Sequence, residues 1–580
     1  MTQTLSHSPV LVAAALHHQI EPALQKIEVW CTTAIPTFRV VGLPGPEIIE
    51  SCERVRAAIA STGIEFPKKR VIVNLSPAGI RKHGTGTDLA IALAVLLSKS
   101  ALRPKGLVVA SGELGLSGQI TSAGKITRTI LAALQAGASD LLLALDDKNK
   151  AQTAAQLILK AHPSSLRSRT SAKPAEAPGW ESALPRLWFV SSLSDAAKVI
   201  QRISHGEVIE MAEFSEPKGA SQDSSHDLLR PSPSLLRKLL ACSAGQHSIL
   251  LLGPKGTGKT ASLSWISALR EDLGPSEELE KALLHELLPE GWSQDPDSRS
   301  PVREVSPHAR AEALLGSIRQ GQVLPGELTL AHGGVLMADE FLEWRRDARE
   351  ALRDPIESGR LILQRGQQCV TLPARFQFAG TANLCPCGGV PPEFSFRSHP
   401  ANPTHHGSGN RCRCSPRHRQ SYLERLSGPI LDRMDCIEWV HPASSQGTAS
   451  RTEIDQIKSH IARIRSQLKE NWGTLPGRLS PTELEAILAR YPQLSQLQAQ
   501  WGTPQCSLRR RHREIRVSLT LAALDGGTLP TEKQMSEARP SALEGLQKLY
   551  QGASATPIHF LSVSAPTQKT QGLTQTSPPP

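Results

Sequence analysis

The stretch Gly253-Pro254-Lys255-Gly256-Thr257-Gly258-Lys259-Thr260 decides the fold of the central part of this chain. It follows the apolar run 248–252, which is typical of a buried strand, and precedes residues 261–269, which have helical periodicity. Glycines let the backbone pass close to phosphate oxygens, and the N–H groups at the start of the helix point toward such an anion. Lys259 would place its charge between the outer phosphates, and the Thr260 hydroxyl would ligate Mg²⁺. A strand, a glycine loop and a helix in this order predict a phosphate-binding loop for ATP rather than a chance glycine-rich turn.

A second motif lies further along the chain, where the apolar run 335–338 ends in Asp339 and Glu340. Such a pair is common by itself, but here it follows a phosphate loop by about eighty residues. Asp339 would hold Mg²⁺ directly or through water, and Glu340 would polarise an attacking water. Together the two motifs predict that the chain binds ATP with Mg²⁺ and hydrolyses it.

The composition of the whole chain narrows the class of protein. At 580 residues it has room for three or four domains of roughly 100–200 residues each. We see no apolar stretch of membrane-spanning length and no secretory signal at the N-terminus, so we expect no contact with a membrane. Ten cysteines in so long a chain are typical of a reduced, cytoplasmic protein. The net charge of +11 favours a polyanionic partner such as nucleic acid.

Two stretches near the N-terminus carry a resemblance to a known family. The first is Val40-Val41-Gly42-Leu43-Pro44 with Arg54-Val55-Arg56, and the second is Val71-Ile72-Val73-Asn74-Leu75-Ser76-Pro77 leading to Asp88-Leu89-Ala90. Together they resemble the N-terminal domain of the ComM/YifB family of magnesium-chelatase-like AAA+ ATPases. The resemblance covers most of residues 9–550, with gaps. It implies an α/β protein with a ribosomal-S5/Lon-protease-like N-terminal domain, a P-loop AAA+ core with a parallel sheet, and a small helical lid.

The resemblance and the composition divide the chain into five segments. We expect the S5/Lon-like domain at 1–203, where strands and helices alternate, and a polar linker at 204–226. The AAA+ core is expected at 227–441, and the helical lid with the C-terminal helices at 442–550. Residues 551–580 are rich in Ser, Thr, Gln and Pro and are predicted to be disordered.

The resemblance to Lon does not extend to proteolysis. The position of the Lon nucleophile falls on Gly86 and that of the Lon base on Thr127. Neither side chain can do the work of a nucleophile or a base, and the neighbouring Lys125 is the one alternative. We therefore expect no Lon-type protease activity.

The resemblance also implies roles for residues that follow the acidic pair. Asn383, which ends the apolar run 376–383, would be the polar sensor of the γ-phosphate or of the water; the alternative is a turn residue. Arg433, in Ser427-Gly428-Pro429-Ile430-Leu431-Asp432-Arg433-Met434-Asp435, would be the arginine finger that reaches the nucleotide of a neighbouring subunit. Such a finger makes hydrolysis depend on a homo-oligomeric ring, usually a hexamer. The alternative for Arg433 is an ordinary ion pair with Asp432 or Asp435.

A third residue implied by the resemblance lies in the predicted lid. Arg509 opens the run Arg509-Arg510-Arg511-His512-Arg513 and matches the family position of a second sensor. The run could equally be a solvated or nucleic-acid-facing surface.

Two cysteine pairs follow Asn383. Cys385 and Cys387 form the first, and Cys412 and Cys414 form the second. Four thiolates suit tetrahedral Zn²⁺, although each pair is spaced more tightly than the usual C-x₂-C. Structural zinc, reduced free thiols and an Fe–S or redox role are all open, and the intervening His399, His405 and His406 are alternative ligands.

Basic residues surround these cysteines and form our candidate nucleic-acid surface. A phosphate contact needs a cation within reach and no fixed geometry, and a solvated basic loop is the alternative. A β-hairpin predicted over 360–372 would add one further cation at its tip, Arg365. The other members of the surface are Arg397, Arg411, Arg413, Arg417, His418, Arg419 and Arg425.

These observations lead to one expected function and three alternatives. The resemblance implies a cytoplasmic AAA+ ATPase that couples ATP hydrolysis to remodelling of single-stranded or branched DNA, as a helicase or branch-migration motor in recombination or natural transformation. The first alternative is a chelatase-like ATPase that remodels a protein partner. The others are a regulatory module that holds ATP without turnover, which Glu340, Asn383 and Arg433 disfavour, and a Lon-like protease.

Overall fold

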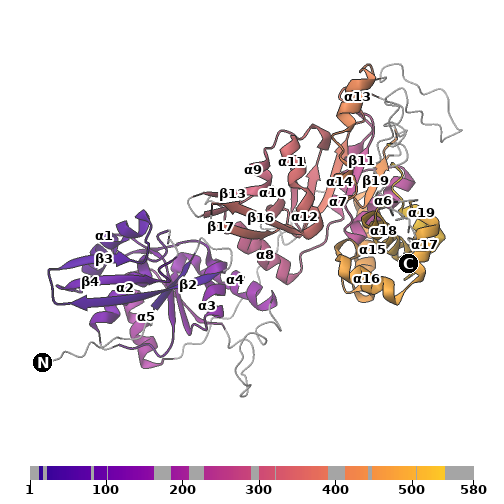
Figure 1. Cartoon of the computed structure of the whole chain (residues 1–580). Coiled ribbons are helices and arrows are strands. Elements are labelled where there is room, and N and C mark those ends of the chain that lie inside the picture. The colour runs from indigo at the N-terminus through magenta and orange to yellow at the C-terminus, as the bar shows by residue number, and fades with distance from the viewer. Residues whose placement is uncertain are drawn as a thin grey trace, which may run out of the picture.

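The computed structural model describes residues 12–16, 22–79, 82, 84–100, 102–161, 184–207, 228–288, 300–319, 322–366, 368–389, 412–441, 447–503, 506–542 and 546. Figure 1 shows three parts in chain order: an α/β unit, a second α/β unit, and a group of helices near the C-terminal end. The predicted tail 551–580 and most of the predicted linker lie outside the described residues, so the segment boundaries stay predictions. Within the described part, no helix combines the length and the apolar surface that crossing a membrane requires.

The N-terminal unit is a seven-stranded mixed sheet with helices on both faces, in the strand order β3-β4-β2-β1-β5-β8-β9. Alternate residues of a strand point to opposite faces. Val12 and Ala14 of β1 therefore pack in one core with α1, α2 and α5, whereas Ala13 packs in the other with α3 and α4. The prediction of a sheet covered by helices is confirmed, and the S5/Lon-like identity stays a prediction. The strands are β1 (Val12–Leu16), β2 (Ala23–Thr32), β3 (Thr37–Val41), β4 (Arg70–Ser76), β5 (Val108–Ser111), β8 (Asp140–Ala144) and β9 (Arg186–Val190), with a small ribbon of β6 (Glu113–Leu114) and β7 (Ile120–Thr121). The helices are α1 (Pro46–Ser61), α2 (Asp88–Lys99), α3 (Ile126–Gln135), α4 (Lys148–Ala161) and α5 (Leu193–His205).

The second unit is built on a parallel five-stranded sheet in the order β12-β15-β18-β11-β19. The strand before the glycine loop, β11, lies between β18 and β19, and its residues Leu250 and Leu251 are buried on opposite faces. Because the strands are parallel, their carboxyl ends share one edge of the sheet, where open α/β sheets bind ligands. The arrangement is consistent with a P-loop AAA+ core. The strands are β11 (Ile249–Leu252), β12 (Val302–Glu304), β15 (Val335–Ala338), β18 (Gln377–Ala382) and β19 (Cys436–Trp439). The helices are α6 (Pro233–Gly245), α7 (Lys259–Ala268), α9 (Ala311–Leu315), α10 (Glu327–Leu330), α11 (Arg346–Ala351), α12 (Arg353–Ser358), α13 (Pro416–Leu423) and α14 (Gly428–Leu431).

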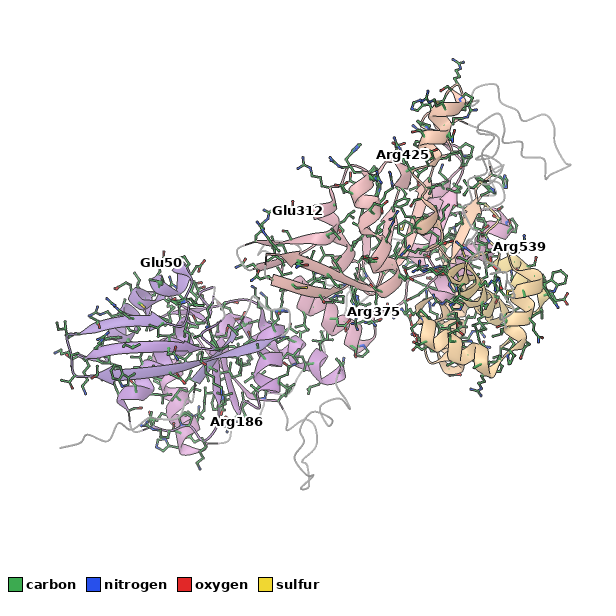
Figure 2. All side chains as sticks on the ribbon, viewed as in Figure 1. Glu50, Arg186, Glu312, Arg375, Arg425 and Arg539 are labelled. Atoms are coloured by element: carbon green, nitrogen blue, oxygen red, sulfur yellow. The ribbon has the colours of Figure 1, made fainter. Side chains whose placement is uncertain are left out.

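The two edges of this sheet can be followed in Figure 2. Arg375, which precedes β18, and Arg425, which contacts Glu343 beyond β15, lie on opposite sides of the unit. The edge at the carboxyl ends of the strands, on the side of Arg425, is the loop edge. The opposite edge, on the side of Arg375, is the entry edge. A two-stranded ribbon of β10 (Leu228–Leu229) and β20 (Thr448–Ala449) lies beside α7.

The helix α8 (Pro275–His285) connects the two α/β units, and two hairpins pack against it. The predicted hairpin is confirmed: β16 (Arg360–Arg365) pairs antiparallel with β17 (Gln368–Pro373). A second hairpin of β13 (Gly316–Arg319) and β14 (Gln322–Pro325) packs beside it, and Leu284 joins their shared core. On its other side α8 contributes Leu279 to the core of the N-terminal unit. The carboxylate of Glu286 also accepts the backbone N–H groups of Thr127 and Arg128, at 2.7 and 3.0 Å.

The C-terminal part is helical, as predicted. Two of its helices are α16 (Pro481–Arg490) and α18 (Leu508–Leu524). The side chains of Ser480 and Ser507 accept a backbone N–H of the first turn and so fix these starting points. The other helices are α15 (Arg451–Trp472), α17 (Gln493–Trp501), which was not predicted, and α19 (Glu532–Ala538).

Candidate nucleotide-binding site

The glycine loop joins β11 to α7 at the loop edge of the parallel sheet. Gly256 and Gly258 both have φ of +80°, a left-handed conformation that favours glycine. Lys259 is 8% exposed, and its Nζ donates to the carbonyl oxygens of Gly253 and Pro254 at 3.0 and 2.7 Å. It also donates to Asn383 Oδ1 at 3.0 Å. Burial lowers the pKa of Lys259, and the carboxylates of Asp339 and Glu340 act in the opposite direction. The predicted lysine and the predicted sensor are therefore in contact.

The acidic pair lies next to the loop because β15 is two strands away from β11 on the same edge. Thr260 Oγ1 donates to Asp339 Oδ1 at 3.0 Å, and the hydroxyl of Thr381 donates to the same oxygen. The backbone N–H of Glu340 in turn donates to Thr381 Oγ1 at 3.0 Å. Hydroxyl and carboxylate oxygens are the ligands that Mg²⁺ prefers, so this cluster fits the metal. Glu340 itself is exposed and has φ of +47°.

Arg433 lies at the entry edge, away from the loop of its own chain. Strands β11 and β19 run side by side in parallel, with Ile249 beside Cys436. The loop follows β11, whereas Arg433 precedes β19. The four-residue length of β11, about 13 Å, therefore separates the two along the sheet.

Arg433 is paired with a carboxylate that the sequence did not indicate. Its NH2 lies 3.0 Å from Glu357 Oε2, and its NH1 donates to the carbonyl oxygen of Pro429 at 2.9 Å. Its Nε is buried without a hydrogen-bond partner among the described residues. Asp435, one of the two carboxylates considered as alternative partners, binds Ser248 and Arg513 instead.

Arg509 shares the same carboxylate. Its Nε lies 2.9 Å from Glu357 Oε1, and its side chain is 55% exposed. A cavity of about 380 Å³ adjoins this point, and its lining includes Glu357, Arg478, Arg509 and Arg516. Both arginines implied by the resemblance thus meet at the entry edge, on one acidic side chain.

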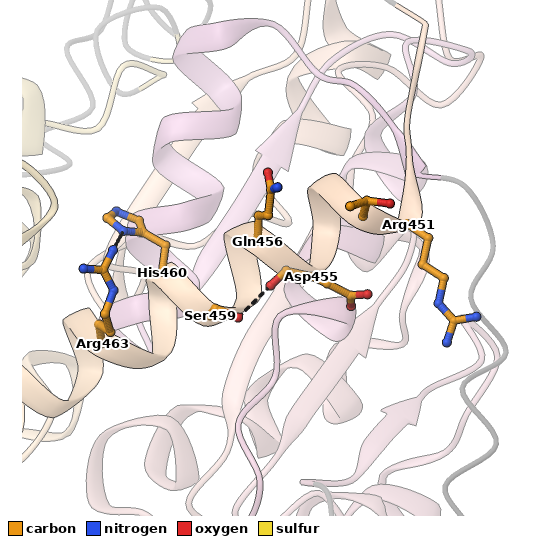
Figure 3. A pocket seen from close by; sticks show the side chains of 7 residues that line it. Arg451, Asp455, Gln456, Ser459, His460 and Arg463 are labelled. Carbon is orange, nitrogen blue, oxygen red and sulfur yellow. Dashed lines mark hydrogen bonds between the residues drawn. The ribbon is translucent and has the colours of Figure 1, made fainter.

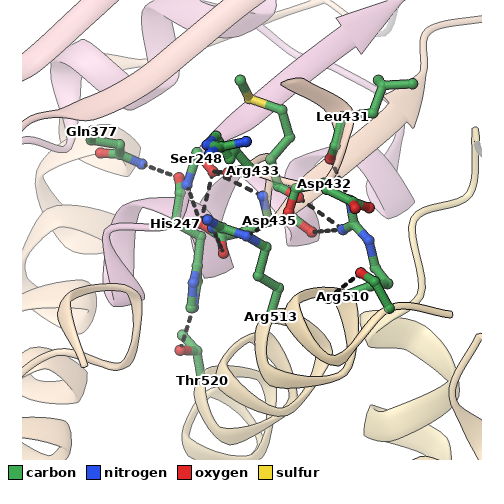
Figure 4. A network of polar contacts seen from close by, with 12 residues as sticks. His247, Ser248, Gln377, Leu431, Asp432, Arg433, Asp435, Arg510, Arg513 and Thr520 are labelled. Atoms are coloured by element: carbon green, nitrogen blue, oxygen red, sulfur yellow. Dashed lines mark hydrogen bonds and ion pairs between the residues drawn. The ribbon is translucent and has the colours of Figure 1, made fainter. Parts of the chain in front are cut away.

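Two further residues of the basic run, Arg510 and Arg513, hold α18 onto the core (Figure 4). Arg510 donates to the carbonyl oxygen of Met434 at 2.8 Å, and Arg513 donates to that of Asp432 at 2.9 Å and to Asp435 Oδ1 at 2.7 Å. Burial alone would raise the pKa of Asp435, but Arg513, His247 and Arg516 outweigh it and hold the pKa at about 2. The interpretation of the whole run as a solvated surface is therefore wrong for Arg510 and Arg513, whereas Arg509 and Arg511 are exposed.

The four cysteines come together in the part of the chain that the structure describes. The sulfur atoms of Cys385, Cys387, Cys412 and Cys414 all lie within 4.8 Å of one another, a grouping that could hold a metal ion. His399, His405 and His406 lie outside the described residues.

The predicted nucleic-acid surface is described in part. Arg397 and Arg411 lie outside the described residues, while Arg413, Arg417 and His418 are exposed around the start of α13. Arg419 is 7% exposed and donates to the carbonyl oxygen of Cys414, so its inclusion in the surface is wrong. Arg425 pairs with Glu343, and Arg365 is exposed but donates to the carbonyl oxygen of Ile318.

A surface hollow of about 480 Å³ along α15 is not part of this site (Figure 3). All of its lining residues belong to that single helix, so no second element brings groups toward it. Arg463 NH2 and His460 Nδ1 contact each other at 2.9 Å along the helix.

Comparison with known proteins identifies the family of the chain. A family model described as "Magnesium chelatase, subunit ChlI" matches residues 233–448, and one described as "Subunit ChlI of Mg-chelatase" matches residues 27–147. The chain is 30% identical over 550 residues to the uncharacterised protein YifB of Escherichia coli, covering 92% of this chain and 96% of YifB. The chain belongs to the ComM/YifB family. The competence protein ComM of Haemophilus influenzae is 29% identical over 536 residues, covering 90% of this chain and 94% of ComM. An uncharacterised protein of Mycobacterium tuberculosis is 28% identical over 528 residues, or 90% of this chain and 95% of that protein.

Membership in the ComM/YifB family supports a general biochemical function for the parallel sheet and its glycine loop. The family is magnesium-chelatase-like and AAA+ ATPase-like, which supports an ATP hydrolase that uses ATP and Mg²⁺.

Three residues of this ComM/YifB site escaped the sequence analysis. Thr381 connects Asp339 to the backbone of Glu340, and its position two residues before Asn383 was the available signal. Glu357 gave no signal, because its partners lie more than seventy residues away in the chain. Leu229 is 47% exposed, and its Cδ2 lies 3.9 Å from a Cβ placed on Gly258. It therefore presents an apolar face beside the loop.

Proposed function

We propose that this ComM/YifB protein hydrolyses ATP at sites shared by neighbouring copies in a ring, and that it uses the energy to remodel DNA. The division of its polar groups between the two edges of the parallel sheet carries this proposal. The loop edge holds the groups that bind phosphate and activate water. The entry edge holds two arginines that the same chain's loop cannot use.

The loop edge supplies the first half of the site. The N–H groups of the loop and the ammonium of Lys259 bind phosphate oxygens, while Asn383 fixes the position of Lys259. Thr260 and Asp339 would hold Mg²⁺, which supplies neutralising charge on the phosphates. Glu340, exposed beside this cluster, accepts hydrogen bonds from the attacking water and orients it.

The entry edge of the neighbouring copy supplies the second half. Arg433 and, more exposed, Arg509 leave Glu357 and turn their guanidinium groups toward the phosphates. A guanidinium presents several donors in a fixed fork and stays charged, which suits the charge that develops on the transferred phosphoryl group. We propose a closed ring, in which every site is completed by a neighbour, and a hexamer is the size that the family resemblance implies.

DNA is the partner that the charge distribution favours. The chain carries a net charge of +11, and Arg413, Arg417 and His418 are exposed together at the start of α13. The word "competence" in the name of the Haemophilus influenzae relative points to the same class of partner. Single-stranded or branched DNA is the proposed substrate, and the cytoplasm the proposed compartment.

The test is steady-state ATP turnover with single-stranded, duplex and four-way-junction DNA. We expect turnover to rise with single-stranded or junction DNA, and binding to weaken steeply with salt. Replacing Arg413 and Arg417 by Gln should lower the salt slope by about one unit for each lost phosphate contact. Replacing Arg345 and Arg346, which are exposed at the start of α11, is the matched control. A turnover indifferent to every DNA would refute the DNA proposal.

A protein-remodelling ATPase is the second candidate, because the matching family models are named after a chelatase subunit. It predicts turnover that DNA leaves unchanged.

We also propose that the N-terminal unit is not a protease. Gly86 carries no nucleophile, and Thr127 is 7% exposed with its backbone N–H bound to Glu286 of the neighbouring unit. Lys125 lies at the N-terminal end of α3 with φ of +54°. The position that we assign to the Lon base is thus in contact with Glu286, at the end of α8. Hydrolysis of casein that is lost on replacing Lys125 would overturn this.

A further inference from the structure

The four clustered cysteines come from two segments that are far apart in the chain. Cys385 and Cys387 follow β18, and Cys412 and Cys414 immediately precede α13. Cys385 Sγ lies 3.0 Å from Cys412 Sγ and 3.4 Å from Cys387 Sγ. All ten cysteines of the chain are free, so no disulfide accounts for this convergence.

The backbone around the sulfurs is arranged to support thiolates. The N–H of Gly389 donates to Cys387 Sγ, and the N–H of Cys414 donates to Cys412 Sγ, each at 3.4 Å. Hydrogen bonds from outer groups of this kind orient metal ligands and tune them. Gly388, with φ of +73°, makes the turn that brings the first donor to its sulfur.

We propose that these four thiolates bind one structural Zn²⁺ and that the site braces the phosphate loop. A tetrahedron with Zn–S bonds of about 2.3 Å has sulfur–sulfur edges of about 3.8 Å. The observed separations, from 3.0 to at most 4.8 Å, lie within about 1 Å of those edges. Four soft sulfur donors in this geometry select Zn²⁺ over Mg²⁺.

The brace runs through Gly388. Its carbonyl oxygen accepts the backbone N–H of Lys255, a loop residue, at 2.8 Å. A Cβ on Gly388 would lie 2.8 Å from the Cβ of Lys255, so the turn and the loop are in close contact. Asn383, which binds Lys259, is only two residues before Cys385. Bound zinc would therefore fix both the loop's Lys255 and the position of Asn383.

The metal is tested directly on the full-length protein, purified without an affinity tag that binds metals. We expect one equivalent of zinc per chain by elemental analysis. After exchange with Co²⁺ we expect the visible absorption of tetrahedral thiolate coordination. The double variant Cys387→Ser, Cys414→Ser should lose the metal, and the matched variant Cys369→Ser, which changes an exposed cysteine outside the cluster, should keep it. A wild-type protein without zinc, a Cys385–Cys412 disulfide in mass spectra of the non-reduced protein, or stoichiometric iron would overturn the proposal. The wild-type measurement decides even if the double variant fails to fold.

The brace is tested by nucleotide affinity, and this part rests on the proposed ATP site. Gly388→Ala leaves all four thiolates in place and should bind ATP on the order of tenfold more weakly, the size expected for losing one hydrogen bond. Gly366→Ala is the matched control, since Gly366 also has positive φ but a Cβ there meets nothing within 4 Å. Equal affinities of the two variants would overturn the brace. Lys259→Ala should lose ATP binding and keep zinc, which separates a failure of the ATP site from a failure of the metal site.

Discussion

The two edges of the parallel sheet differ in how their polar groups are satisfied. At the loop edge, Lys259, Asn383, Thr260 and Asp339 contact one another within one chain. At the entry edge, Arg433 and Arg509 converge on the single carboxylate of Glu357, and Arg433 keeps a buried Nε without a partner among the described residues. The polar groups of the loop edge are thus largely paired with one another. The two arginines of the entry edge instead lie away from the glycine loop of their own chain. This difference supports our proposal that the catalytic unit forms at the contact between two copies.

Removal of the arginine finger tests this comparison with the largest expected effect. Arg433→Ala should leave ATP binding intact and lower turnover about 10³–10⁵-fold, the range observed for arginine fingers. Arg319→Ala, which removes an exposed arginine paired with Glu312, is the control and should turn over normally. If turnover of the Arg433→Ala variant stays within a few fold of wild type, Arg433 serves only in its ion pair with Glu357.

Removal of the proposed water-orienting carboxylate comes next. Glu340→Gln should bind ATP as the wild type does and lose about 10²–10⁴ of turnover, because the amide no longer accepts a proton from water. Glu343→Gln is a neighbouring control, since Glu343 contacts Tyr422 and Arg425 rather than the loop. If the Glu340→Gln variant still hydrolyses ATP, another residue must activate the water.

The burial of His247 near the entry edge predicts a dependence of stability on pH. Burial lowers the pKa of His247 to about 4; Asp435 opposes this, and Arg516, Arg513 and Lys238 add to it. The unfolded chain takes up this proton near pH 6.5, whereas the folded chain does so only near 4. Stability contributed by neutral His247 is therefore present above pH 6.5 and is lost as the pH falls toward 4, by about 1.4 kcal/mol per unit.

Unfolding by urea at pH 7 and pH 5 measures this contribution. His247→Gln, which retains a polar contact for Thr520, should be less stable at pH 7 but should lose about 2 kcal/mol less than wild type between the two pH values. Identical losses in both proteins would show that His247 is not the group that titrates.

The smallest effect is expected at Glu357. Glu357→Gln weakens the hold on Arg433 and Arg509, so these side chains become easier to present to a neighbouring copy. An ion pair of this exposure is worth about 0.2–1 kcal/mol, which corresponds to turnover at low protein concentration rising by a factor of about 1.4 to 5. Glu350→Gln, whose carboxylate is equally exposed and pairs with Arg353, should show no change. A decrease for Glu357→Gln would instead make the carboxylate part of the assembled site.

The loop edge could be predicted from the sequence because its groups lie in short contiguous motifs. The glycine loop fixes Lys259 and Thr260, and the run before Asp339 marks a strand that ends at the same edge. The parallel sheet then brings these strand ends together, so motif order alone was sufficient.

The entry edge could not be predicted in the same way. Asp432 and Asp435 were considered as partners for Arg433 because they are close in sequence, whereas Glu357 reaches it from α12 through tertiary packing. The run on α18 has the composition of a surface. Helical phase nevertheless turns Arg510 and Arg513 inward, where they donate to backbone carbonyls after α14 that would otherwise lack partners.

A subunit-mixing experiment tests the shared site most directly. Lys259→Ala protein cannot bind ATP and Arg433→Ala protein cannot complete a neighbour's site, so each alone should be inactive. Random mixing should restore roughly a quarter of wild-type turnover, since one interface in four joins an intact loop to an intact Arg433. A mixture as inactive as its components would contradict a site built from the two different edges of neighbouring copies.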